Sequence, residues 1–280
     1  MSISRRSFVG LSAVAVGGVG VPLGRSFGVM QPDAAVPRDA APWLPRTSNE
    51  DAQAVVGASR ANIEVVREMV TQRPALARSA IDWGFGDWES ALGAASHTGR
   101  REIAELLIAH GARPNLFTLA MLGHVDAVRA TLQAMPGVQR IKGPHGITLM
   151  SHARAGRDEA ASVVEYLESV GGADEQYVNE PVDDAAAISG AYTLEPRTPD
   201  GTLADDAPND HGRFEIAEGR RGLEFRAEGT FARNLFHQGG LAFNPAGAEA
   251  VLLRFEPAAA ATRVAIELGD RTVWATRDPS

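Results

Sequence analysis

The sequence predicts an α+β chain in which a stack of short helices precedes a small antiparallel β barrel or sandwich. Two observations carry this prediction. Between residues 49 and 176, apolar side chains recur at helical spacing, and small residues and glycines return at similar places in about four irregular units. Between residues 190 and 277, short runs alternate apolar and polar residues, and glycine-containing turns separate them.

The N-terminal residues 1–30 have the character of an export signal. Residues 3–10 read Ile-Ser-Arg-Arg-Ser-Phe-Val-Gly and resemble the twin-arginine signal, which the matching positions Ser4, Arg5, Arg6 and Phe8 carry. The apolar run that follows is interrupted by glycines and is shorter than the ~20 residues that span a bilayer. We therefore expect export by the twin-arginine route to the periplasm or the cell exterior, with no membrane span once the signal is removed. A disordered basic tail is the alternative.

The prolines of residues 31–48 favour a linker between this segment and the first helix. A second linker is expected at residues 177–189, where the helical periodicity has ended and the alternating runs have not begun. The boundaries that follow are 49–176 for the helical repeat and 190–277 for the β domain.

The clearest helical unit spans residues 92–115. Small residues such as Ala94 and Ala95 let two short helices approach closely, and Gly99 suits the tight turn between them. Gly111 follows the second helix as a C-terminal cap. The unit resembles an ankyrin repeat, and the positions that carry the resemblance are Leu92, Ala95, Gly99, Glu102, Ile103, Leu106, Leu107, Gly111, Ala112 and Asn115.

The neighbouring units are weaker and irregularly spaced. Their turn residues Ala61, Gly99, Gly123 and Gly156 lie 38, 24 and 33 positions apart, whereas ankyrin repeats recur at about 33 residues. The short interval predicts that the hairpin between the second and third units is missing. The last unit carries about three extra residues near residues 157–161, judged against the same period.

The candidate binding residues lie mainly in residues 81–88, Ile-Asp-Trp-Gly-Phe-Gly-Asp-Trp, which we call the aromatic finger. The ankyrin resemblance implies a projecting hairpin here, and tryptophan is favoured at binding hot spots. The candidates are Asp82, Trp83, Phe85, Asp87 and Trp88, joined by a basic spot at Arg100 and Arg101. The alternatives are that the rings pack over the first repeat as a cap and that the arginines form a solvated helix face.

Residues 190–277 predict seven or eight short strands that form a meander closed into a barrel or sandwich. The expected strands are 191–194, 213–217, 223–227, 231–236, 251–255, 264–268 and 272–276, and residues 244–247 predict a turn. The segments 190–192, 223–225, 243–247 and 273–275 give the domain a loose resemblance to small lipocalin-like domains of exported bacterial proteins. That resemblance implies a small apolar ligand in the barrel mouth, while a barrel filled by its own side chains is the alternative.

No pattern in the chain predicts catalysis, a cofactor or a metal site. The sequence contains none of the motifs HExxH, GxSxG and GxGxxG, and no phosphate loop. Its seven histidines include no pair at helical i, i+4 spacing, and the absence of cysteine excludes disulfides and thiolate metal ligands. Residues 200–211 gather several acids, which can hold calcium, although a solvated hairpin loop is the expected structure.

We therefore expect an exported binding module or scaffold rather than an enzyme. A formal net charge of −8 disfavours nucleic acid as a partner, and another exported or envelope protein is the expected partner. The alternatives are small-molecule or lipid binding in the β domain and, less favoured, an enzyme with a site between the two domains. The last of these predicts either paired acids with perturbed pKa values or a histidine–carboxylate pair in a deep cleft.

Overall fold

The computed structural model describes residues 46–175, 185–195, 212–256, 262–269 and 271–279. The expected export signal, all but the last three residues of the first linker, and the whole acid-rich stretch lie outside the described residues. The described chain contains helices followed by a closed antiparallel β barrel, so its class is α+β.

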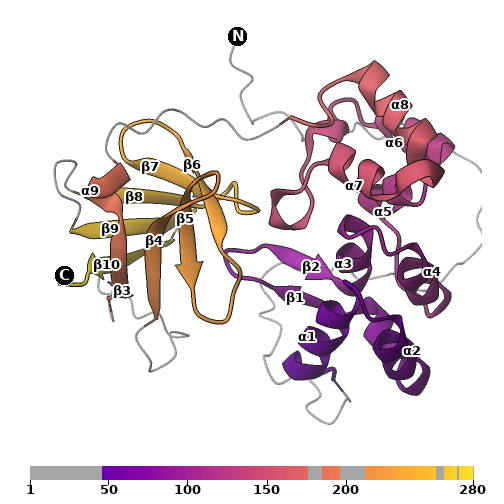
Figure 1. The fold of residues 1–280 in the computed structure, drawn as a ribbon, viewed down its shortest axis with the longest axis horizontal. Helices are drawn as coiled ribbons and strands as arrows, with labels where there is room; N and C mark the ends of the chain where they lie inside the picture. The colour runs from indigo at the N-terminus through magenta and orange to yellow at the C-terminus, as the bar shows by residue number, and fades with distance from the viewer. Residues whose placement is uncertain (1–45, 176–184, 196–211, 257–261, 270, 280) are drawn as a thin grey trace, which may run out of the picture. The chain divides into compact units, whose positions relative to one another are not determined.

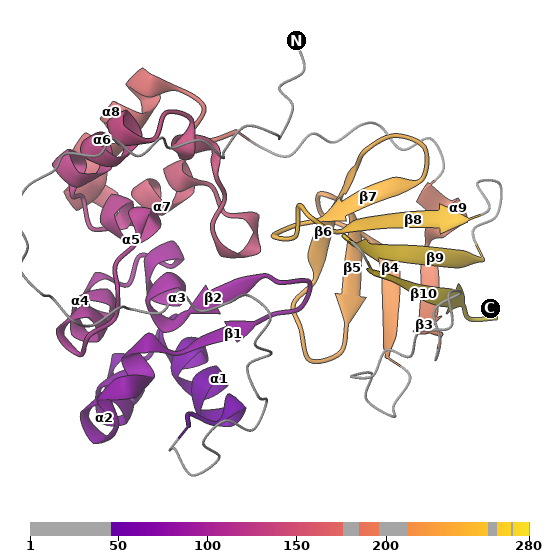
Figure 2. The ribbon, with the colours of Figure 1, turned by 180° about the vertical axis from the view of Figure 1, so that it is seen from behind.

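The helical part is built from four pairs of short helices. The pairs are α1 (Asn49–Ala58) with α2 (Ile63–Gln72), α3 (Ala91–His97) with α4 (Arg101–Ala109), α5 (Leu116–Met121) with α6 (Val125–Ala134), and α7 (Leu149–Ala155) with α8 (Ala161–Val170). The first helices of successive pairs pack on one another along the series α1, α3, α5 and α7. Figure 1 and the reverse view in Figure 2 both show this side-by-side order.

Local signals fix where these helices begin and turn. The side chain of the residue before the helix accepts a backbone N–H at the start of α1, α2, α3, α5 and α7, from Ser48, Asn62, Ser90, Asn115 and Thr148. Between α3 and α4, Gly99 has a φ of 68°, and a Cβ there would lie 2.2 Å from the carbonyl oxygen of Ala155. Only glycine satisfies both demands, so the turn and the packing of the next helices select the same residue.

The connections between pairs differ from one another. A 3₁₀ turn, η1 (Pro74–Arg78), and a hairpin of β1 (Ala80–Asp82) and β2 (Trp88–Ser90) join α2 to α3. Only residues 110–115 join α4 to α5, so the described chain lacks a hairpin there, as the spacing predicts. The turns η2 (Val138–Arg140) and η3 (Pro144–Gly146) precede α7, and η4 (Arg157–Ala160) holds the extra residues expected after it.

Eight strands close into the barrel, which decides between the barrel and the sandwich of the sequence prediction. A short helix, α9 (Ala185–Ile188), precedes them. The strands are β3 (Gly190–Leu194), β4 (Arg213–Gly219), β5 (Gly222–Ala227), β6 (Arg233–His237), β7 (Ala242–Pro245), β8 (Leu252–Glu256), β9 (Arg263–Leu268) and β10 (Arg271–Arg277). Each pairs antiparallel with its sequence neighbour, and β10 returns to pair with β3.

One strand corrects the sequence prediction. Residues 244–247 predict a turn, but β7 extends through Asn244 to Pro245, and the turn begins after it. Proline is tolerated here because it ends the strand. The strand is held in place by Phe243, which is fully buried in the barrel core.

Aromatic rings fill the barrel interior. Tyr192 stacks on Phe214 with ring centroids 5.5 Å apart, and Phe214 stacks on Phe225 at 4.6 Å. The hydroxyl of Tyr192 donates to the carbonyl oxygen of Ile188 at 2.8 Å, which ties α9 to the barrel. Among the described residues, no helix combines the length and the hydropathy that a membrane span requires.

Candidate functional site

The hairpin of β1 and β2 presents different side chains on its two faces. Successive side chains of a strand point in opposite directions. Asp87 and Glu89 are therefore on one face and are 3% and 0% exposed, whereas Trp88 is on the other and is 62% exposed. The same short segment thus carries a buried pair of carboxylates and an exposed indole.

Glu89 is the most heavily bonded of these side chains. Its Oε2 accepts from Arg60 Nη2 at 2.5 Å and from Trp83 Nε1 at 2.8 Å, and its Oε1 accepts from His97 Nε2 at 2.7 Å. The Nε2 of His145 lies 3.3 Å from the same Oε1. Burial raises the pKa of Glu89, but the hydrogen bonds from His145 and His97, together with nearby positive charge, outweigh burial and lower the pKa to about 2.

His145 joins the two carboxylates. Its Nδ1 donates to Asp87 Oδ2 at 2.9 Å, and its backbone N–H donates to Asp87 Oδ1 at the same distance. The residue has a φ of 63°, in the left-handed region that few non-glycine residues adopt. Burial lowers the pKa of His145, but its bonds to Asp87 and Glu89 outweigh that effect, so the pKa is raised.

Asp87 also pairs with an arginine from the barrel. Arg233, at the start of β6 and 1% exposed, donates from Nη1 to Asp87 Oδ2 at 2.8 Å. The same guanidinium donates to the carbonyl oxygens of Trp83, Gly84 and Ala246. A buried charge is tolerated when it is paired and its remaining donors are satisfied, and Arg233 meets both conditions.

Aromatic rings surround this cluster. The ring of Trp83 meets the edges of His145 and Phe231 at centroid distances of 5.9 and 5.8 Å, and the guanidinium of Arg60 lies 4.8 Å from the Trp83 ring. The rings of Phe231 and His145 are 4.3 Å apart. We name Asp87, Glu89, His97 and His145 the buried polar cluster; it is largely shielded from water, since its histidine side chains are only 12% and 13% exposed.

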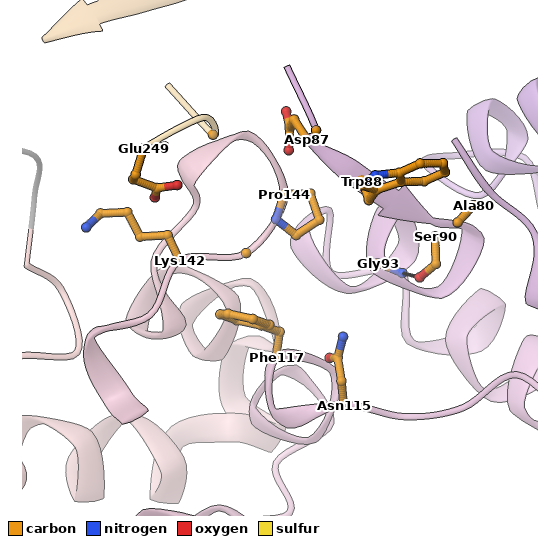
Figure 3. Close-up of a pocket in the computed structure, with 13 residues that line it drawn as sticks. Ala80, Asp87, Trp88, Ser90, Gly93, Asn115, Phe117, Lys142, Pro144 and Glu249 are labelled. Carbon is orange, nitrogen blue, oxygen red and sulfur yellow. Dashed lines mark hydrogen bonds between the residues drawn. The ribbon is translucent and has the colours of Figure 1, made fainter. Parts of the chain in front are cut away.

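A groove of about 430 Å³ lies beside the cluster. Figure 3 shows its lining, in which the finger, the start of α5 and the segment before α7 contribute side chains. Trp88 and Asp87 belong to it, and glycine backbone forms much of the rest. The full lining is Ala80, Gly86, Asp87, Trp88, Ser90, Gly93, Asn115, Phe117, Lys142, Gly143, Pro144, Gly247 and Glu249.

The structure places the residues predicted in the finger in three surroundings. Asp82 is exposed and accepts the backbone N–H of Gly84 at 2.9 Å. Trp83 and Phe85 are half-buried, and Phe85 packs against the barrel core through Phe225 at 5.3 Å. Trp88 is exposed at the groove, so the finger residues do not form one surface.

The two predicted arginines lie elsewhere. Arg100 donates to the carbonyl oxygen of Arg60 at 2.9 Å, and Arg101 donates to that of Leu122 at 3.3 Å. Both line a second hollow of about 420 Å³ near the turns that join the helices of the first, second and fourth pairs. The basic spot is therefore a different site from the groove that Trp88 borders.

The sequence analysis does not identify Glu89, His97, His145 or Arg233. Glu89 could have been found, because the strand period places it on the same face as Asp87. His97 and His145 are 48 residues apart, and no local pattern predicts that they meet. Arg233 shares the buried face of β6 with Leu235, and an inward-facing arginine is a signal that it has a partner.

The cluster offers metal-ligating atoms. A nitrogen of His97, a nitrogen of His145 and an oxygen of Glu89 all lie within 4.8 Å of one another. Either a metal ion or a proton could be held between the imidazoles and the carboxylates. Either one would hold the hairpin to α3 and to the segment before α7.

Comparison with known proteins does not extend these observations. No protein-family model matches the chain, and no curated protein matches it at a significant level.

Proposed function

We propose that this protein is an exported binding module that captures an extended segment of another exported or envelope protein in the groove beside Trp88. The observation that carries the proposal is the 62% exposure of Trp88 at the edge of that groove. A large indole that remains exposed beside a concave surface loses little conformational freedom on binding and buries much area. We propose that the protein acts by binding this partner and not by catalysis.

The lining of the groove supports a peptide rather than a compact ligand. Gly86 is part of the lining and carries no side chain, so a partner backbone can come close to it. A Cβ built on Gly86 meets no atom within 4 Å, which marks open space next to Trp88. An extended chain fits such a surface, since its backbone approaches Gly86 while one apolar side chain covers the indole.

The stacked helix pairs support a scaffold of the ankyrin type. Short paired helices, glycine turns and a hairpin between the first and second pairs are features that the ankyrin resemblance implies. Such stacks bind macromolecules along the face that their first helices and hairpins form. We place the binding function on this face because the barrel interior is filled with packed aromatic rings.

The test is peptide binding with a matched pair of variants. Peptides are selected by display on the chain without residues 1–30, and affinities are measured by fluorescence anisotropy. Trp88→Ala should weaken a selected peptide by at least about 30-fold, as expected for a tryptophan hot spot worth ~2 kcal/mol. Met135→Ala removes another exposed apolar side chain, 52% exposed and outside the groove lining, and should change affinity less than about 3-fold. Equal losses in the two variants would reject the groove as the binding surface.

Export is tested separately. The resemblance of residues 3–10 to the twin-arginine signal supports this part of the proposal. Replacing Arg5 and Arg6 together by lysine should retain the protein inside a bacterium that has the twin-arginine route. Continued export of that variant would show that the segment is not such a signal.

A further inference from the structure

We propose that Glu89, His97 and His145 bind one divalent transition-metal ion, with Zn²⁺ as the ion whose chemistry fits best. This inference goes beyond the proposed binding function and rests on the buried polar cluster alone. Two imidazoles and one carboxylate are a ligand set that zinc uses where a fourth position stays open to water or another ligand.

The distances suit a single ion. Zinc bonds of about 2.0–2.1 Å in a tetrahedral site place neighbouring ligand atoms about 3.3 Å apart. The Oε1 of Glu89 is 2.7 Å from His97 Nε2 and 3.3 Å from His145 Nε2, and the three ligand atoms all lie within 4.8 Å of one another. The three atoms therefore lie close enough together for one ion to bind all of them.

The groups behind the ligands orient them. A histidine that binds a metal through Nε2 commonly donates its Nδ1–H to a carboxylate, which fixes the ring and makes it a better ligand. His145 has this arrangement, because its Nδ1 donates to Asp87 Oδ2 at 2.9 Å. Asp87 is held in turn by Arg233, and Glu89 is held through its other oxygen by Arg60 and Trp83.

The backbone around His145 supports the same assignment. A left-handed φ of 63° is an uncommon conformation outside glycine and persists where the surroundings impose it. The imposed geometry brings both ring nitrogens of His145 to carboxylates and directs its N–H to Asp87. The imidazole is therefore held in one position before an ion arrives, as an ordered ligand requires.

The binding experiment uses the untagged chain without residues 1–30. The protein is stripped with a chelator, loaded with Zn²⁺ and dialysed, and bound zinc is counted by elemental analysis. We expect one equivalent in the wild type and none in His97→Ala. His124→Ala removes an exposed histidine outside the cluster and should keep the full equivalent.

Asp87→Asn tests the orienting role. It keeps the ligands and removes the charge behind His145, so zinc affinity should fall about 10–100-fold while the stoichiometry is unchanged. Glu89→Gln should abolish binding at the same protein concentration. Circular dichroism of each variant without metal shows whether it is folded.

A readout on the wild type alone keeps the proposal falsifiable if a variant does not fold. Zinc-edge X-ray absorption should show four nitrogen or oxygen ligands with the scattering of two imidazoles, and Co²⁺ should give the strong visible bands of a four-coordinate site. Failure of the stripped wild type to take up Zn²⁺ would overturn the proposal. Retention of zinc by folded His97→Ala would overturn it as well, because the ion would then be bound elsewhere.

Discussion

Removal of Arg233 should strongly destabilise the folded protein. Its guanidinium is 1% exposed, pairs with the buried Asp87 and also donates to three backbone carbonyl oxygens. Methionine fills much of the same volume without the charge, so Arg233→Met leaves a carboxylate and carbonyls without their donor. Deleting one partner of a buried ion pair costs about 3–5 kcal/mol. Asp87 retains His145 as a second partner, so we expect a loss of about 3 kcal/mol.

The assay is urea unfolding followed by tryptophan fluorescence and circular dichroism. The matched control is Arg254→Met, which removes an arginine from another barrel strand. Arg254 pairs with Glu267, and the two side chains are 47% and 36% exposed. Exposed pairs contribute about 0–1 kcal/mol, so the control should lose less than about 1 kcal/mol.

A double-mutant cycle isolates the pair itself. Asp87→Asn removes the charge that loses its arginine partner in Arg233→Met, so the combined variant should be more stable than the sum of the single losses by at least about 1 kcal/mol. If Arg233→Met costs no more than Arg254→Met, or if the two losses simply add, the buried contact contributes little. In that case the barrel and the hairpin would not be coupled through this ion pair.

Three further outcomes follow from the structure. Gly99→Ala should lower the free energy of unfolding in urea by at least about 2 kcal/mol, because φ is 68° and the new Cβ would lie 2.2 Å from a carbonyl oxygen. Gly57→Ala, on the open face of α1, is the control and should raise it by up to ~1 kcal/mol. Burial lowers the pKa of His152 from 6.5 to about 4, so the unfolded chain takes up the proton first as pH falls. This histidine should therefore reduce the free energy of unfolding by about 3 kcal/mol between pH 6.5 and pH 4. In His152→Leu, this contribution should be missing when stability is measured against pH. Trp88→Ala should leave the melting temperature unchanged within about 2 °C, since the indole is 62% exposed, and a larger drop would give Trp88 a structural role.

Much of the fold follows from local patterns in the sequence. The alternation of Leu223 and Phe225 predicts a strand with one buried face, and both residues are buried in β5. The 24-residue interval between Gly99 and Gly123 predicts the missing hairpin, because too few residues remain to build one. β7 escapes this reasoning because its residues Asn244 and Pro245 have strong turn preferences that burial of the strand overrides.

The buried polar cluster is harder to predict for a physical reason. Each of its histidines lies in a locally ordinary position: His97 ends a helix, and His145 stands between Pro144 and Gly146 in a turn. What makes them a site is the packing of segments that are far apart in the chain, and single-sequence periodicity carries no information on that packing. Only the placement of Asp87 and Glu89 on one face of the hairpin follows from the local sequence. It predicts two buried acids but does not predict which residues bind them.

The hairpin connects the cluster to the groove. Because strand side chains alternate, a restraint on Asp87 and Glu89 also fixes the direction of Trp88 between them. A binding residue held in one orientation before the partner arrives loses less entropy on association. Loosening the cluster should therefore weaken peptide binding without any direct contact with the peptide. Asp87 lines the groove, so the variant that separates the two effects is His97→Ala, which changes the cluster and leaves the groove lining intact.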